Sequence, residues 1–226
     1  MPSDSASYGQ AGRNTAAGHY NELLFVIQQQ IGKLATSMPV KVVAQRGGGL
    51  DVVGYVDVTP MVQQLTGNGQ PIDHGTITNV PYFRLQGGAN AVIIDPSIGD
   101  IGIACFSSRD ISSVKRSRKK APPGSRRQYD FSDAMYIGGI LSAAPTQYIQ
   151  FSSGGITIHS PTKITLEAPI TEVTGQLVMT GASGTGATMK GGVTNTGGTI
   201  SSNGIVLESH VHSGVQSGSS ETGGPV

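Results

Sequence analysis

The sequence predicts a mainly β protein in which a small five-stranded barrel is followed by a slender, intertwined triple-stranded β-helix built from three copies of the chain. Residues 39–110 contain short apolar segments separated by Gly-rich turns, which is the pattern of a small barrel. About half of residues 151–226 are Gly, Ser or Thr, yet their aliphatic residues recur in an eight-residue register. Only 13% of the chain is charged and 37% is hydrophobic, so one large conventional core is not expected.

Residues 1–35 are expected to form an N-terminal extension followed by a short helix. Apolar residues recur three and four positions apart from Leu23 to Leu34, which predicts an amphipathic helix over about 19–35 that ends before Pro39. The apolar stripe of this helix could pack on its own domain or on partner chains. Packing on its own domain is the default expectation.

The barrel is expected over residues 36–112. Its five predicted strands are residues 40–44, 54–58, 75–80, 91–94 and 101–106. An oligonucleotide/oligosaccharide-binding (OB) barrel is the commonest five-stranded choice, although strand count alone leaves other small barrels open.

Residues 113–150 are expected to form a basic linker and connecting strands. A dense run of Lys and Arg covers Lys115–Lys120 and resumes at Arg126 and Arg127. This run could bind phosphate groups, in nucleic acid or lipopolysaccharide, or it could be a solvated connecting loop. The general rule for blocks of like charge favours the loop. No aromatic residues for base stacking are interleaved with the charges, so a nucleic-acid partner is not expected.

Residues 151–208 are expected to form the β-helical shaft. Ile156 and Ile164, like Ile158 and Leu166, stand eight positions apart, each in a short strand with its aliphatic residues on one face. Ordering costs about 1–2 kcal/mol per residue, whereas a buried aliphatic side chain returns about 1.5–3 kcal/mol, so such a strand needs partners. Three identical chains around one axis would pair every strand edge and layer the aliphatic residues. The alternative is a disordered Gly/Ser/Thr tail.

Residues 209–226 are expected to form a metal-binding apex. Positions i and i+2 of an extended strand face the same side, so the imidazoles of His210 and His212 would both point toward the threefold axis. Three chains would then supply six nitrogen ligands in octahedral geometry. This favours iron(II), with nickel or cobalt possible in vitro, over tetrahedral zinc. A site with no open position would be structural rather than catalytic.

Other features limit the functional classes. The single cysteine, Cys105, cannot form an intrachain disulfide, and the net charge of +1 gives no global attraction to nucleic acid or acidic membranes. Residues 1–5 lack the features of a secretory signal, and no segment approaches the length of a membrane span. No Ser/His/Asp arrangement or paired carboxylates near aromatics are visible, so neither enzymatic activity nor a small-molecule substrate is expected.

The sequence around His210-Val211-His212, the Gly223-Gly224-Pro225 ending, the segment Pro96–Gly102, and Arg109-Asp110 resemble the baseplate central spikes of contractile-tail phages, including baseplate assembly protein V. The resemblance covers roughly residues 36–226. It implies a homotrimeric, membrane-piercing spike with an OB-type barrel at its base, a β-helical shaft, and an apex that holds one Fe²⁺ ion per trimer through six histidines. Of these ligands, only His210 and His212 carry over by position.

The resemblance further implies a location in the virion, at the tip of the tail baseplate, for a protein made in the host cytoplasm. Its expected partners are two further copies of itself, and the baseplate hub and tail tube proteins through its N-terminal region. The bacterial outer membrane is the expected target, and sheath contraction the source of the piercing force. A trimeric receptor-binding tail fibre or adhesin is the alternative. The small polar residues that follow His212 favour a point over the broader aromatic tip of a receptor-binding fibre.

Overall fold

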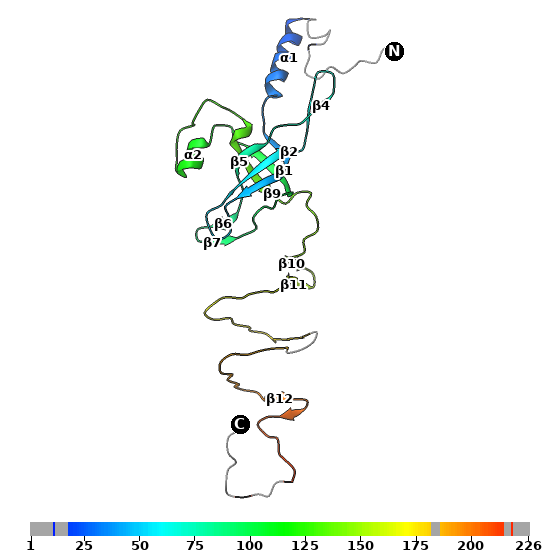
Figure 1. Ribbon diagram of the computed structural model, residues 1–226, viewed down its shortest axis with the longest axis vertical. Helices are drawn as coiled ribbons and strands as arrows, with labels where there is room; N and C mark the ends of the chain where they lie inside the picture. Colours follow the sequence, from blue (N-terminus) through cyan, green and yellow to red (C-terminus); the bar gives the residue numbers. More distant parts are fainter. Residues whose placement is uncertain (1–10, 12–17, 182–185, 215–217, 219–226) are drawn as a thin grey trace, which may run out of the picture. The chain divides into compact units, whose positions relative to one another are not determined.

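The computed structural model describes residue 11, residues 18–181, residues 186–214 and residue 218. The expected N-terminal extension and much of the expected apex therefore lie outside the described residues. The chain divides into two compact units, Met1–Pro161 and Thr162–Val226, and each unit is described by itself (Figure 1).

A curled, antiparallel five-stranded sheet forms the centre of the first unit (Figure 1). In order across the sheet it consists of β5 (Ile77–Pro81), β2 (Tyr55–Pro60), β1 (Ser37–Arg46), β8 (Ile101–Phe106) and β9 (Ala134–Gly138). A parallel bridge between Tyr82 and Tyr136 joins the two edges, where the Phe83 amide donates to the Tyr136 carbonyl at 2.8 Å. The sheet is therefore a half-barrel that closes at one point.

Two irregularities in strand pairing help the sheet to curl. The register of β1 against β2 shifts between Val42 and Ala44, and that of β2 against β5 shifts between Val56 and Val58. Such bulges bend a strand and increase its local twist.

Alternate residues of the central strands form the core. In β2 and β8 every second residue is buried, as period-2 alternation predicts. The core consists of Val40, Val42, Val56, Val58, Ile77, Val80, Tyr82, Ala104, Phe106, Ala134 and Tyr136. Ile77 is the only aliphatic residue larger than valine in this core, which fits the low hydrophobic content of the chain.

Four of the five predicted barrel strands are present, and one prediction was wrong. Residues 91–94 do not form a barrel strand: β7 (Asn90–Val92) pairs with β6 (Leu85–Gly87) in a separate hairpin whose residues are all exposed. The fifth place in the sheet belongs to β9, so the sheet continues past residue 112, where the sequence analysis ended the barrel. A second small hairpin joins β3 (Gln64–Leu65) to β4 (Pro71–Ile72).

The predicted N-terminal helix is present as α1 (His19–Ile31), but its expected packing on its own domain is wrong. None of its residues is buried. Leu23, Ile27 and Ile31 keep 56%, 45% and 60% of their surface exposed. The helix leads through residues 32–36 into β1.

The expected basic linker contains a short helix, α2 (Ser112–Ser117), a loop, and a 3-10 turn at Phe131–Asp133 before β9. Phe131 packs edge-on against Phe106 of the core, with ring centroids 5.1 Å apart. Beyond β9, β10 (Tyr148–Ser152) and β11 (Gly155–His159) form an antiparallel hairpin, still within the first unit.

The second unit has little regular structure within the single chain. Its strands are β12 (Ser201–Ser202) and β13 (Ile205–Val206), which pair with each other, and none of the described residues from 162 to 200 lies in a helix or strand. All of its described residues are exposed except Val206, which is half-buried. Its aliphatic side chains are therefore uncovered, for example Ile164 at 52%, Leu166 at 72% and Ile170 at 83%.

Candidate functional site

The two predicted metal ligands lie side by side. The ring centroids of His210 and His212 are 5.0 Å apart and their planes meet at 79°. Between them, the Val211 side chain is 91% exposed. The backbone here follows a turn, in which the Ser209 and His210 amides both donate to the Val206 carbonyl, at 3.3 Å and 3.0 Å. Neither histidine lies in a strand. The proximity of the two imidazole rings therefore does not come from the extended strand that was predicted.

The hydrogen bond of His210 leaves one ring nitrogen available to a metal. Its Nδ1 lies 2.8 Å from the Leu207 carbonyl oxygen. Because a carbonyl oxygen only accepts hydrogen bonds, this contact places a proton on Nδ1, and in the neutral imidazole Nε2 then has a lone pair to offer. Metal-ligating histidines usually donate their other ring N–H to such a carbonyl, which fixes the ring orientation. The residues present therefore fit a metal site in this respect.

One chain supplies too few ligands to complete such a site. Among the described residues, no group of three or more His, Cys, Asp or Glu side chains lies close enough together to hold a metal ion. Two imidazoles alone would therefore leave a metal site incomplete within the described part of one chain.

The side chains of the basic run do not act as one patch. Arg127 pairs with two buried carboxylates: its Nη2 lies 3.1 Å from Asp110 Oδ2, and its Nε lies 3.3 Å from Asp133 Oδ2. Lys115 donates to the carbonyls of Ser132 and Asn79, at 3.1 Å and 3.4 Å. These two cations therefore hold the connection between β8 and β9 in place.

Sequence reasoning singled out Asp110 only within the Arg109-Asp110 motif and missed both its burial and Asp133. Asp110 accepts from the Ser125 hydroxyl at 2.6 Å and from the Ser112 amide at 2.8 Å, while Asp133 accepts from the Ile111 amide at 3.0 Å. The Ser112 hydroxyl, then the Ser125 hydroxyl, the Ser112 amide and the Arg127 charge together hold the pKa of Asp110 well below its ordinary value. Their role is structural, because each oxygen is directed at a backbone or side-chain donor of the same connection.

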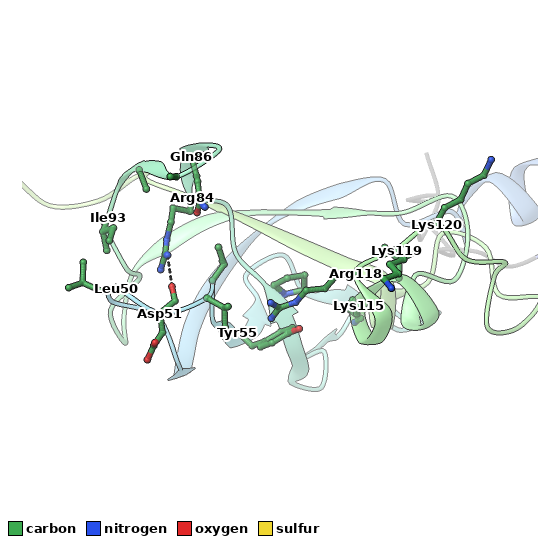
Figure 2. A pocket seen from close by; sticks show the side chains of 16 residues that line it. Leu50, Asp51, Tyr55, Arg84, Gln86, Ile93, Lys115, Arg118, Lys119 and Lys120 are labelled. Carbon is green, nitrogen blue, oxygen red and sulfur yellow. Dashed lines mark hydrogen bonds between the residues drawn. The ribbon is translucent and has the colours of Figure 1, made fainter.

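Three further cations of the run line a groove on the first unit, with a cavity volume of about 940 Å³ (Figure 2). In Figure 2, Leu50 and Ile93 lie at one end of the groove, and Lys119 and Lys120 at the other. Arg84 lies near the apolar end and is held in place, donating to the Asp51 carbonyl at 2.8 Å and to Asp95 at 3.3 Å. The groove thus combines an apolar end with a basic wall of Arg118, Lys119 and Lys120.

None of the helices in the described parts of the chain has the length and apolar character needed to cross a membrane. Of the other histidines, His19 lies 3.7 Å from a Glu22 carboxylate oxygen on the exposed helix α1, and two serve local packing. His74 meets Phe131 edge-on at 5.3 Å, and His159 stacks on Tyr148 at 5.1 Å.

The C-terminal third of the chain is similar in sequence to phage spike proteins. Residues 154–203 match the family described as "Phage spike trimer", and residues 204–226 match the "GpV Apex motif". The chain is also 35% identical over 118 residues to the "Spike protein" of Escherichia phage P2, an alignment that covers 46% of this chain and 51% of that protein. The chain thus spans about half the length of the curated relative it matches.

Proposed function

We propose that this chain is one subunit of a homotrimeric central spike at the tip of a contractile phage tail baseplate, or of a related injection machine. The observation that carries the proposal is the pair of contiguous matches, to a spike trimer over residues 154–203 and to a spike apex over residues 204–226. These matches cover the same part of the chain in which nearly every described residue is exposed. The likeness to the phage P2 spike protein supports the same function.

The exposed aliphatic residues give a physical reason for a trimer. Ile164, Leu166 and Ile170 lie in a segment that forms no secondary structure within one chain. In a triple-stranded β-helix the strands of three chains pair with one another, and each aliphatic residue meets its two symmetry copies at the axis. The chain then reaches a folded state that it cannot reach alone.

The spike works mechanically. Force from sheath contraction is concentrated at a narrow tip, and a dry aliphatic axis gives the shaft the stiffness to pass through the bacterial outer membrane. No catalytic step or small-molecule substrate is required. The protein would lie in the virion at the baseplate tip, with its N-terminal region against the baseplate hub and tail tube proteins.

The barrel at the base is proposed to be of the OB type. The strand order β5-β2-β1-β8-β9, with a parallel bridge between the edge strands, agrees with a five-stranded, partly open Greek-key barrel. The long connection from β8 to β9 holds α2 and the buried carboxylates.

A receptor-binding fibre would share the trimeric shaft. It is the weaker candidate, because the apex match covers residues 204–226, where a fibre would place a receptor-binding tip.

His210 and His212 are the proposed ligands of one metal ion per trimer, with iron(II) as the leading candidate and nickel or cobalt as substitutes in vitro. A closed shell of six imidazoles would bind the three chains together at the apex, where strand ends otherwise fray first. We expect the double variant His210→Ala/His212→Ala to remain trimeric but to lose bound metal, as measured by elemental analysis. If the double variant still bound one metal ion per trimer, the assigned ligands would be wrong.

The function itself is tested by the mass of the purified protein in solution, measured by light scattering together with its metal content. A trimer containing one iron ion is the expected result. A metal-free monomer would contradict the proposal and would leave the half-barrel as the functional part.

A further inference from the structure

The helix α1 has an apolar surface that the other described residues of the chain leave exposed. Tyr20, Leu24, Ile27 and Ile31 are 76%, 39%, 45% and 60% exposed. An isolated helix of this length, 13 residues, is marginal in water, because nucleation is costly and stability comes mostly from packing of an apolar face. Gly18 at its N-cap contributes no side-chain hydrogen bond. A stable α1 therefore needs a partner beyond the described part of the chain to cover this surface.

The spacing of these residues identifies the kind of surface. From Tyr20 to Ile31 the intervals are four, three and four, which is the a/d alternation of a heptad repeat, with Leu24 and Ile31 at a and Tyr20 and Ile27 at d. Residues in these positions form the seam between helices of a coiled coil. The pair Leu24 at a and Ile27 at d favours assemblies of more than two helices.

The flanks of the seam suit association between identical chains. The e and g positions are Asn21, Leu23, Gln28 and Gln30, none of which is charged. In a parallel coiled coil the g position of one helix faces an e position of its neighbour, so charged flanks would repel unless e and g carried opposite charges. Neutral flanks remove this obstacle.

From these observations we infer that α1 forms a parallel three-stranded coiled coil with the α1 helices of two further copies of this chain. The inference rests on the proposed trimeric spike, which holds three chains parallel. It adds a second trimer interface, at the opposite end of the sequence from the shaft. Because only residues 32–36 separate α1 from β1, three barrels held together would bring three α1 helices to a high effective concentration.

Two neighbouring residues provide a matched test. Ile27 at d and Val26 at c are both β-branched and similarly exposed, 45% and 52%, but only Ile27 faces the seam. Each is replaced by cysteine in the full-length chain that carries Cys105→Ser, and each protein is treated with a short bis-maleimide cross-linker. We expect Ile27→Cys to give covalently linked chains about tenfold faster than Val26→Cys, because of its higher effective concentration at the seam. Denaturing gels report the linked species, and light scattering on the same samples reports the native mass.

The possible outcomes distinguish failure of the α1 coiled coil from failure of the proposed spike function. A trimeric mass with selective linkage at position 27 supports the coiled coil. A trimeric mass with equal linkage, or none, at the two positions overturns it and leaves the spike standing, with α1 covered by another protein such as the baseplate hub. A monomeric mass contradicts the proposed function, and the inference fails with it.

A second pair of variants guards against an effect of the cysteines themselves. We expect Ile27→Glu to lower the helical circular dichroism signal of the trimer and Val26→Glu to leave it nearly unchanged, because only position 27 would bury three carboxylates together. Equal losses in the two variants would overturn the inference.

Discussion

At the scale of single residues, the half-barrel depends on positions where no side chain fits. Gly102 lies in β8 opposite Gly138, and a Cβ atom built on it would stand 2.4 Å from the Ile137 carbonyl oxygen and 2.5 Å from Cε2 of Tyr136. Both neighbours belong to β9, and Tyr136 is 1% exposed, so neither can move freely. The pairing of the last two strands thus requires glycine at this position.

We expect Gly102→Ala to destabilise the half-barrel by about 1–3 kcal/mol, the usual cost of overpacking a filled site. Gly75→Ala is the control, because a Cβ atom there meets nothing within 4 Å. Thermal unfolding followed by near-ultraviolet circular dichroism compares the two variants with the parent. Equal melting temperatures for the two variants would show that β9 shifts without cost.

Asp110 should make stability depend on acid. Its pKa is lowered in the folded chain by the Ser112 and Ser125 hydroxyls, the Ser112 amide and Arg127. The carboxylate therefore stabilises the fold fully above its unfolded pKa of about 3.9, and this contribution is lost as the pH falls from about 4 toward the folded value. We expect Asp110→Asn to be less stable than the parent at pH 7 and to lose less stability between pH 5 and pH 2.

Thermal melts over that pH range test the role of Asp110, with Asp51→Asn as the control at an exposed carboxylate. Parallel pH profiles for the parent and Asp110→Asn would contradict it.

At the scale of elements, the predicted shaft rests on alternation between inward and outward residues. Ile164 belongs to the eight-residue register, while its neighbour Thr165 would face outward. We expect Ile164→Ala to lower the free energy of unfolding of the trimer by about 2–5 kcal/mol per chain, as for a buried aliphatic residue. Thr165→Ala should change it little. Denaturant unfolding of the two trimers compares them, and equal midpoints would argue against an aliphatic axis.

The strands that sequence reasoning found are those whose apolar residues point inward. In β1 and β2, Val40, Val42, Val56 and Val58 alternate with exposed or half-buried residues, so the period-2 pattern was visible. β9 falls in the region where connecting strands were expected, but it was not assigned to the barrel because its pattern is inverted: Ala134 and Tyr136 are buried, whereas Met135 and Ile137 are 42% and 46% exposed.

The opposite error placed residues 91–94 in the barrel. Ala91, Val92, Ile93 and Ile94 form an apolar run without alternation, and such a run does not say to which sheet a strand belongs. The pairing of β7 with β6 depends on the turn at Gly88, whose φ of 58° lies in the left-handed region.

At the candidate site, the sequence showed which histidines to consider, but it did not show the local backbone. The pair His210 and His212 was visible as a motif, whereas the turn at Val206 that orients His210 depends on hydrogen bonds between residues without a periodic signal. The buried pair Asp110 and Asp133 was hidden for a different reason. Both carboxylates pair with the single cation Arg127, which the sequence shows only as one member of a basic run.

At the scale of the whole molecule, the two units differ in what a single chain can achieve. The first unit contains its own core, and its described strands pair with one another within one chain. The second unit has no buried residue among those described. Towards the two ends of the sequence, α1 and the proposed shaft both expose aliphatic residues that could pack against other copies of the chain. The half-barrel, which lies between them in the sequence, is complete by itself apart from its one-point closure.

The exposure of residues such as Leu166 and Ile170 also sets the order of events in time. The half-barrel can fold at a rate that does not depend on protein concentration, whereas the proposed trimeric shaft would form only after three chains meet. On dilution from denaturant, we expect the near-ultraviolet signal of the half-barrel to recover in a fast phase that is the same at every concentration. Recovery of protease resistance in residues 162–214 should be slower and should accelerate as the concentration rises. A newly made chain would thus pass through an interval in which its unassembled shaft is prone to aggregation and proteolysis. The concentration of other copies of the chain would determine how long that interval lasts.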